Sequence, residues 1–303
     1  MSERAMNFAQ PSETIITRAA QHHGLASRSI GTILMDAGRL STDAAESIIK
    51  LQKEGGLRFG DAAIQLGLLT EADVRYALSH QFEYPYLMPG DTSLSEEVVA
   101  AYKPFSPIVE KLRALRSQLM LRWFDGESGN KMLAVTSPER GEGRSYIAAN
   151  LAVVFSQLGE RTLLIDADLR HPRQHEIFKL GNRNGLSAVL AARTGMDEAI
   201  VRIPDLLGLS VMPAGAIPPN PQELFNRPQF LTLLESAQRQ FDVILFDTSI
   251  GGAYADAQMI ASRAGGAIVL SRKDVTQAAR LRELTDSLRH SGATVVGSVL
   301  NGN

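Results

Sequence analysis

The sequence has no cysteine, a single tryptophan and no long apolar run. The absence of cysteine excludes disulfide bonds and thiolate metal sites, and it favours a reducing compartment such as the cytoplasm. The N-terminal residues Met-Ser-Glu-Arg-Ala lack the apolar core of a signal peptide, and no stretch approaches the roughly 18 to 20 apolar residues that span a bilayer. We therefore expect a cytoplasmic protein that reaches a membrane only through a partner.

A strong charge of either sign is also missing. The net charge is -2 over 303 residues, which gives no general attraction to nucleic acid or anionic lipid, so we expect no nucleic-acid partner. A content of 44% hydrophobic and 21% charged residues is ordinary for a globular protein, and the length is sufficient for two domains.

The stretch Ala134–Ala152 is an apolar run that breaks into a glycine turn and continues as a helix. Its glycines, Gly141 and Gly143, allow backbone N–H groups to approach an anion, and the helix directs its positive N-terminus to the same place. Ser145 stands where a hydroxyl group binds Mg²⁺ in phosphate loops. This layout predicts a nucleotide-binding loop, with a ligand-free glycine turn as the alternative. The predicted nucleotide contacts of the loop are Pro138, Glu139, Arg140, Gly141, Glu142, Gly143, Arg144, Ser145 and Tyr146.

The usual pattern of such loops is G-x-x-x-x-G-K-[ST], and this sequence departs from it twice. Pro138 occupies the first glycine position, and Arg144 occupies the lysine position. A lysine carries a compact point charge, whereas a guanidinium is a wide planar fork. We therefore do not expect Arg144 to fold back along the loop as the lysine does.

Strands and helices alternate from residue 106 onward. Beyond the loop, the predicted strands are 161–168, 207–213, 242–247, 267–270 and 293–300. The predicted helices are 106–123, 146–158, 222–241 and 276–290. This order predicts an α/β fold, a P-loop domain with a mostly parallel sheet and helices on both faces. Asp166, Asp168 and Asp247 follow strand ends, where such sheets bind ligands, and together with the loop they indicate Mg²⁺ and a nucleoside triphosphate.

An internal repeat precedes this domain, with an offset of 29 residues from Gly31 to Gly60. The matched positions are Gly31 with Gly60, Gly38 with Gly67, Leu40 with Leu69 and Gln52 with Gln81. Each copy predicts a short helix that ends at its second glycine and a longer helix opened by an N-cap, Ser41 or Thr70. The repeat predicts a small all-α domain of two helical motifs.

The two copies resemble the motif R-L-G-x-x-L-x-x-x-G-x-L…Q in the N-terminal domain of type II secretion and pilus ATPases, some of which bind cyclic di-GMP. The second copy begins with Arg58, whereas the first has Ser29 at that position and Arg28 one residue earlier. The resemblance implies a candidate cyclic di-GMP site made of Arg58 and the four matched pairs. A helical module that binds only protein is the alternative.

The resulting domain prediction has four parts. A flexible tail covers 1–26, with a short helix considered at 14–21, and the helical domain covers 27–86. A proline-containing linker covers 87–105, and the P-loop domain covers 106–303. In the first helix of that domain, Glu110, Arg113 and Arg116 share one face, and both arginines are expected to face solvent.

From Glu110 onward the sequence resembles the bacterial tyrosine kinases, the P-loop family that regulates capsule and exopolysaccharide export. The matching pieces are Glu110-x-x-Arg113-x-x-Arg116, Ser137-Pro…Gly-Glu-Gly, Leu163–Pro172, Asp247-Thr248 and Val299–Asn301. More narrowly, it resembles the short chain-length determinant kinases of exosortase-associated exopolysaccharide systems.

The resemblance implies roles for individual residues. Ser145 and Asp247 would hold Mg²⁺, joined by Asp166 in the metal set, and Asp166 or Asp168 would accept the proton of the substrate tyrosine. Arg144 would stand at the catalytic lysine position, and Asn301 would contact adenine. The helix with Glu110, Arg113 and Arg116 would dock on a neighbouring subunit and close a ring.

The implied function is an ATP-dependent tyrosine autokinase at the inner face of the inner membrane, acting with a membrane-embedded polysaccharide co-polymerase. The alternative is a nucleotide-gated scaffold that transfers little phosphate. Family kinases carry a tyrosine-rich C-terminal tail as substrate, and the tyrosines here form no such tail. They are Tyr76, Tyr84, Tyr86, Tyr102, Tyr146 and Tyr254.

Overall fold

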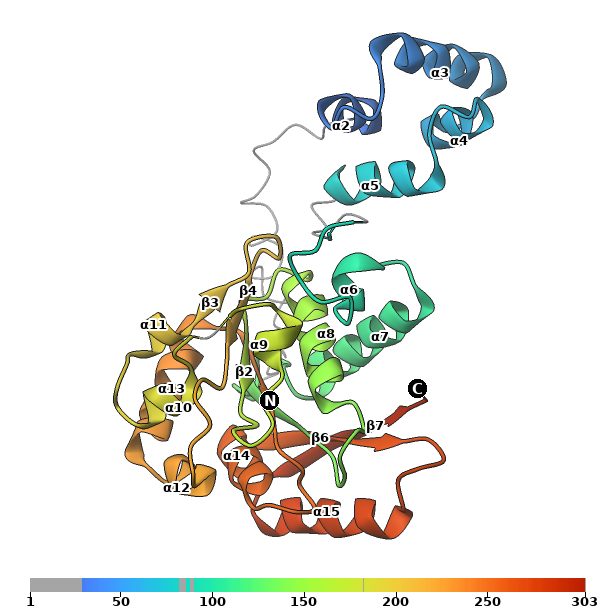
Figure 1. Ribbon diagram of the computed structural model, residues 1–303. Helices are drawn as coiled ribbons and strands as arrows, with labels where there is room; N and C mark the ends of the chain where they lie inside the picture. Colours follow the sequence, from blue (N-terminus) through green and yellow to red (C-terminus); the bar gives the residue numbers. More distant parts are fainter. Residues whose placement is uncertain (1–28, 82–85, 88–89, 182, 303) are drawn as a thin grey trace, which may run out of the picture. The chain divides into compact units, whose positions relative to one another are not determined.

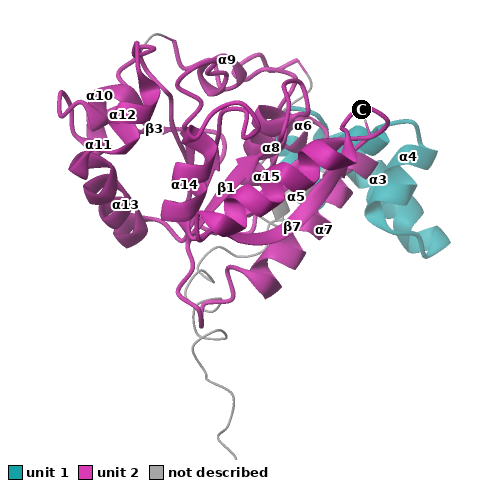
Figure 2. Cartoon of the chain, turned by 90° about the horizontal axis from the view of Figure 1, so that it is seen from below, with its two compact units in different colours: residues 1–84 teal, residues 85–303 magenta. Residues whose placement is uncertain are grey.

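The chain divides into two compact units, residues 1–84 and 85–303, which Figure 2 colours separately. The structure is a computed structural model and describes residues 29–81, 86–87, 90–181 and 183–302. The tail predicted at 1–26, including the helix considered at 14–21, lies outside the described residues.

The first unit contains two pairs of a short and a longer helix (Figure 1). The bounds are α2 (Ile30–Asp36), α3 (Thr42–Gly55), α4 (Phe59–Gln65) and α5 (Glu71–Gln81). The Ser41 hydroxyl accepts a hydrogen bond from Ala44 N at 3.2 Å and so caps α3. Before α5, Asp73 N donates to Thr70 Oγ1 at 3.2 Å while Thr70 N donates to Asp73 Oδ2 at 3.0 Å. These bonds satisfy backbone N–H groups that the first turn of each longer helix leaves unpaired.

The repeated glycines of this unit serve packing and turns. Gly38 and Gly67 have φ of 67° and 66° and end the short helices in the left-handed conformation. Gly31 and Gly60 are buried inside helices. A Cβ atom would lie 3.3 Å from the Phe59 ring at Gly31 and 2.7 Å from a Val74 methyl at Gly60. The close helix contact therefore requires a glycine at position 60, and the contact at Gly31 is tight.

The second unit is built on a seven-stranded sheet in the order β3-β4-β2-β5-β1-β6-β7 (Figure 1). The strands are β1 (Met132–Thr136), β2 (Thr162–Asp166), β3 (Val201–Arg202), β4 (Leu209–Met212), β5 (Val243–Asp247), β6 (Gly266–Arg272) and β7 (Thr294–Asn301). Every strand pair is parallel except β3 with β4, which is antiparallel. The predicted mostly parallel sheet is confirmed, and the short edge strand β3 is an addition that the sequence did not predict.

Both faces of this sheet are covered, as predicted. Successive side chains of a strand point to opposite faces, so Leu133 and Val135 join one core while Met132 and Ala134 join the other. The first core includes α6 (Val99–Tyr102), α7 (Pro107–Arg122), α8 (Arg144–Ser156) and α9 (Gln174–Ile177). The second includes α10 (Leu186–Leu190), α11 (Met196–Ala199), α12 (Pro221–Phe225), α13 (Pro228–Gln240), α14 (Asp256–Ala264) and α15 (Ala278–His290).

Two boundaries differ from the prediction. The segment 87–105 is not a free linker, because Val98 and Ala100 are fully buried in the first core and Leu87 N donates to Ala101 O at 2.9 Å. The single helix predicted at 222–241 is divided into α12 and α13. Pro228 begins α13, where its missing N–H costs nothing, and it could not continue a helix from the preceding turn.

Trp123, at the end of α7, joins that helix to the sheet. Its indole N–H donates to Met132 O at 2.8 Å, at the start of β1. A Cβ atom at Gly266, the first residue of β6, would lie 2.6 Å from the Trp123 ring, so a glycine is needed there. The central strand β1 is thus fixed against α7 at its base.

No helix in the described ranges is long and apolar enough to cross a membrane.

Candidate functional site

The predicted acids meet at the C-terminal edge of three adjacent strands. Strands β2, β5 and β1 are neighbours, and Asp166 and Asp247 lie opposite each other in the register of β2 with β5. The phosphate loop leaves β1 at the same edge and enters α8 at Arg144. Parallel strands thus bring the loop and both carboxylates together, although they are far apart in the sequence.

The loop borders a pocket of about 530 Å³. Gly141 and Gly143 have φ of 78° and 94°, which only glycine adopts readily, and these values turn the loop into the N-terminus of α8. The predicted contacts that line the pocket are Arg140, Gly141, Gly143, Arg144, Ser145 and Tyr146. The pocket also includes His171, Pro172 and Arg173 from the segment after β2, none of which was predicted as a nucleotide contact.

Three other predicted nucleotide contacts, Pro138, Glu139 and Glu142, are not among the residues that line this pocket. Glu142 is 1% exposed and accepts hydrogen bonds from Glu139 N, at 2.7 Å, and from the Thr276 hydroxyl. Asn301, at the end of β7, donates from Nδ2 to Glu142 O at 3.2 Å. Glu142 and Asn301 thus hold the loop, and the contact of Asn301 with adenine stays a prediction.

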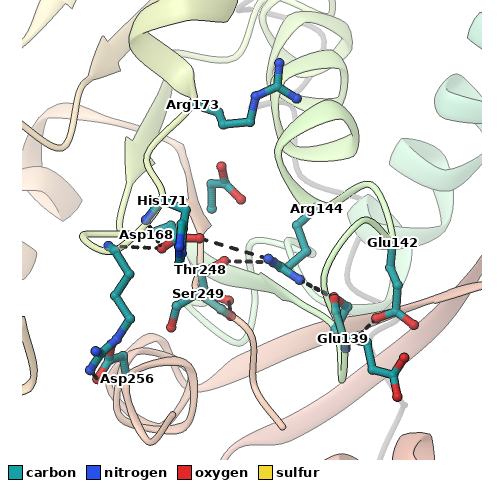
Figure 3. Close-up of polar contacts among 12 residues, drawn as sticks. Glu139, Glu142, Arg144, Asp168, His171, Arg173, Thr248, Ser249 and Asp256 are labelled. Atoms are coloured by element: carbon teal, nitrogen blue, oxygen red, sulfur yellow. Dashed lines mark hydrogen bonds and ion pairs between the residues drawn. The ribbon is translucent and has the colours of Figure 1, made fainter. Parts of the chain in front are cut away.

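The Arg144 side chain contacts the loop and the end of β5 (Figure 3), and its difference from a lysine at this position stays a prediction. Its Nε donates to Thr248 O at 2.9 Å, and its Nη1 donates to Glu139 O at 2.8 Å and to the Ser137 hydroxyl. Its Nη2 lies 4.0 Å from Asp168 Oδ2. The planar fork explains this geometry, because several donors in fixed directions reach acceptors on both sides of one buried side chain.

Asp166 and Asp247 form a fully buried pair of carboxyl groups. Burial raises the pKa of Asp166 well above its ordinary range, and the nearby charge of Asp247 raises it further. Burial also raises the pKa of Asp247, to about 6, against the opposing effects of the Ser145 hydroxyl, the Gln174 amide and the Arg144 charge. The pair holds a proton more readily than surface acids do, and a cation placed between them would remove this effect.

The pair fits a divalent cation. Oδ1 of Asp166 and Oδ1 of Asp247 are buried and have no hydrogen-bond partner among the described residues. Carboxylate and hydroxyl oxygens are the ligands that Mg²⁺ prefers, and Ser145 supplies a hydroxyl from the neighbouring loop. Orphaned acceptors of this kind are costly without a partner, so the residues present suit Mg²⁺.

Asp168 lies near Arg144 and His171 (Figure 3). Its Oδ1 accepts hydrogen bonds from Arg170 N, at 3.1 Å, and His171 N, at 2.9 Å, and its side chain borders the pocket. Asp166 is fully buried and does not border the pocket. Of the two acids predicted to accept the tyrosine proton, Asp168 is therefore the one that an entering hydroxyl group can approach.

Sequence reasoning missed two supporting features. The Arg170 guanidinium pairs with the buried Asp256 at 2.6 Å and lies 3.9 Å above the Tyr254 ring. Gln174 donates hydrogen bonds to both buried acids. The position of Arg170, two residues after Asp168, could have indicated its role from the sequence. Gln174 belongs to no recognised motif.

The predicted oligomerisation residues are less exposed than expected. Arg113 pairs with Glu110 on α7, and its side chain is only 18% exposed. Arg116 Nη1 donates to Val154 O of α8 at 2.7 Å. The expectation that both arginines face solvent is wrong, because Arg113 is mostly covered beside Glu110 and Arg116 connects α7 to α8.

The candidate cyclic di-GMP residues divide by environment. Leu40 and Leu69 are buried in the core of the first unit, and Arg58 is exposed at the start of α4. Gln52 is half-buried, and the side chain of Gln81 lies outside the described residues. A Cβ atom at Gly31 or Gly60 would point toward Phe59 or Val74 of another helix, and the approach of a ligand to these backbones stays a prediction.

The raised pKa of Asp247 predicts a pH dependence of Mg²⁺-dependent nucleotide binding. As the pH falls through about 6, Asp247 takes up a proton and competes with the cation. We expect the Mg²⁺-dependent part of the affinity for ADP to fall by up to about tenfold per pH unit below that point. Titration calorimetry at pH 7.5 and pH 5, with EDTA as the control, measures it; equal losses with Mg²⁺ and with EDTA would contradict the assignment.

No family model matches the sequence, whereas several individual proteins are similar to it. Tyrosine-protein kinase YwqD of Bacillus subtilis is 35% identical over 209 residues, which cover 69% of this chain and 87% of that protein. The putative tyrosine-protein kinase EpsB of Ralstonia solanacearum is 34% identical over 206 residues. That match covers 67% of this chain but only 27% of EpsB.

Two solved structures are also similar. The kinase domain of the Escherichia coli tyrosine kinase ETK has a TM-score of 0.66 and 29% identity, and the match covers 73% of this chain and 85% of that one. The chimerical protein CapA2B2 has a TM-score of 0.64 and 31% identity, covering 75% of this chain and 97% of that one.

Proposed function

This chain belongs to the family of bacterial tyrosine-protein kinases, and from that membership we propose that it transfers the γ-phosphoryl group of ATP to tyrosine. The observation that carries the proposal is the buried pair Asp166 and Asp247, whose unpaired oxygens lie beside a phosphate loop. A structural sheet edge gains nothing from two adjacent buried carboxylates, whereas a cation site requires them.

Each part of the site has a role in this reaction. The N–H groups of the loop near Gly141 and Gly143 would bind phosphate oxygens, and Ser145, Asp166 and Asp247 would hold Mg²⁺. Mg²⁺ held there would supply positive charge that neutralises the phosphates. Asp168 accepts the proton of the tyrosine hydroxyl as its oxygen bonds to the γ-phosphorus and the bond from that phosphorus to ADP breaks, and Asn301 contacts the adenine.

We also propose the setting of this activity. The sequence resemblance to chain-length determinant kinases supports a role in exopolysaccharide chain length, together with a membrane-embedded co-polymerase at the inner membrane. Assembly into a ring would use the α7 face that carries Glu110. Because Arg116 also anchors α7 to α8, sizing the wild-type protein with nucleotide and the partner's cytosolic segment is the appropriate test of assembly.

Phosphotyrosine mass spectrometry on the purified protein tests the kinase proposal directly. With ATP and Mg²⁺, we expect phosphate to appear on tyrosine, at a rate that the cytosolic segment of a membrane partner increases. The variant Asp168→Asn removes the proposed proton acceptor and leaves Asp166 and Asp247 in place. Absence of phosphotyrosine under all these conditions, in a protein that binds ATP, would contradict the proposal.

One observation favours a second function, a nucleotide-gated scaffold that transfers little phosphate. The Arg144 guanidinium donates its hydrogen bonds to Thr248, Glu139 and Ser137 and so holds protein groups at the position from which a lysine would reach phosphate. In this case the wild-type protein would change its assembly state when ATP is added, and mass spectrometry of the same samples would find no phosphotyrosine.

For the first unit we propose a protein-docking module, with cyclic di-GMP binding as the alternative. The buried glycines serve contacts between helices of this unit, and the exposed Arg58 is the feature that suits a guanine or phosphate. If cyclic di-GMP binds, we expect a Kd in the micromolar range or weaker, because Ser29 replaces the matching arginine and one charge-assisted bond contributes about 1.5–3 kcal/mol. Calorimetry on the full chain decides it, and Arg58→Ala, the control, should abolish any heat.

A further inference from the structure

Gln174, the first residue of α9, contacts both buried acids at the sheet edge, and it has no role in the function proposed so far. Its backbone N–H donates to Asp166 Oδ2 at 2.9 Å. Its side-chain Nε2 donates to Asp247 Oδ2 at 2.8 Å and to the backbone O of Ser145 at 3.1 Å. One residue therefore connects β2, β5 and the first turn of α8.

The orientation of the Gln174 amide follows from its neighbours. The backbone oxygen of Ser145 can only accept a hydrogen bond, so the amide nitrogen must face it. The same nitrogen then has its second hydrogen available for Asp247. Gln174 is fully buried, and its Oε1 has no partner among the described residues, so the position is not explained by a need to satisfy the amide itself.

The hydrogen bonds leave the two acids alike, with one carboxylate oxygen bonded and the other without a partner. On Asp166, Oδ2 is held by the N–H groups of Arg173, at 3.0 Å, and Gln174. On Asp247, Oδ2 is held by the Gln174 amide. In both, Oδ1 is buried and has no hydrogen-bond partner in the part of the chain that the structure describes. Fixing one oxygen of a carboxylate fixes the direction of the other.

We propose that Gln174 is a positioning residue for the Mg²⁺ site, which orients Asp166 and Asp247 so that each presents its free oxygen. The inference rests on the proposed function, because it assumes that the buried pair holds Mg²⁺. A glutamine suits the task, since its amide donates hydrogen bonds without adding charge beside two carboxylates. Partners of metal ligands typically contribute 10- to 100-fold to metal affinity.

The test measures binding of a fluorescent ADP by the full chain over a range of Mg²⁺ concentrations and separately in EDTA. In Gln174→Leu the side-chain donor is lost, and in Gln174→Asn the amide is one methylene too short to reach Asp247. Both variants keep the backbone bond to Asp166. We expect the Mg²⁺ concentration for half-maximal binding to rise about 10- to 100-fold, with the affinity in EDTA changed by less than about twofold.

Gln157→Leu is the matched control. Gln157 is also a buried glutamine, 9% exposed, and its Nε2 donates to a backbone oxygen, that of Ala100, at 3.1 Å, outside the site. This variant should keep the wild-type Mg²⁺ requirement. The inference is overturned if the Gln174 variants keep it too, or if they lose affinity equally in Mg²⁺ and EDTA while thermal melting reports a folded protein. A wild-type protein that binds ADP with no Mg²⁺ dependence would instead overturn the proposed function.

Discussion

Replacement of Asp247 by asparagine is expected to abolish Mg²⁺-dependent nucleotide binding and to lower phosphoryl transfer by at least about 100-fold, because a carboxylate ligand is lost where charge develops. The same change should raise the melting temperature of the ligand-free protein. At neutral pH the folded state keeps two acids buried and close together, and burial has raised the pKa of Asp247 to about 6. Replacing one acid removes the repulsion between the two carboxylates and the cost of burying a charged group.

The sign of this stability effect follows from proton binding. A raised pKa means that the folded state binds more protons than the unfolded state between the ordinary range of an aspartate and pH 6, so stability falls as the pH rises through that window. Above pH 6 the folded state carries the full free-energy cost of the buried charge, and asparagine removes that cost. The melting gain of Asp247→Asn over wild type should therefore be larger at pH 7.5 than at pH 5.

Asp242→Asn is the control, because it makes the same change beside the other end of β5. Asp242 pairs with Arg161 at 2.7 Å on the surface, where an ion pair contributes little. It should leave Mg²⁺ dependence intact and should not stabilise the protein. Wild-type Mg²⁺ dependence in Asp247→Asn would refute the metal assignment of the pair.

The second large effect is expected for Arg144→Lys. Three acceptors now share the buried guanidinium, and a single ammonium cannot reach Thr248 O, Glu139 O and the Ser137 hydroxyl together. Each buried group left without its bond costs about 1–3 kcal/mol. We expect a clear fall in melting temperature and about a tenfold or larger loss of phosphoryl transfer, since the loop loses its link to β5.

Arg161→Lys is the matched substitution at a surface pair, where the arginine side chain is 57% exposed, and it should change neither property. A rise in transfer for Arg144→Lys would mean that the arginine is a compromised replacement for lysine. That result would favour the scaffold as the function of the wild-type chain. Melting curves and initial rates from the same preparations separate the two outcomes.

The features predicted well from sequence are those that a local pattern determines. Buried strands read as apolar runs, and the acids that end them converge because parallel strands share one edge. The sequence alone therefore predicts Asp166, Asp168 and Asp247 beside the loop. The helix pairs of the first unit likewise follow caps and glycine stops that are visible in the sequence.

The features that were missed depend on contacts between distant segments. The apolar runs in 87–105 are short and interrupted by proline. No local pattern therefore shows that Val98 and Ala100 enter the core on one face of the sheet. Gln174 follows a proline turn, and its significance appears only when β2 and β5 lie side by side. The inward position of Arg144 depends on backbone oxygens at Glu139 and Thr248, which no sequence motif records.

The position of Trp123 provides an optical probe for one unit of the chain. The sequence has one tryptophan, and it is 7% exposed at the base of β1, in the unit of residues 85–303. Indole emission therefore reports only the unfolding of that unit, whereas far-ultraviolet circular dichroism reports the helices of both. Denaturant curves recorded by the two methods on the intact chain separate the stability of the nucleotide-binding unit from that of the helical repeat without cutting the chain.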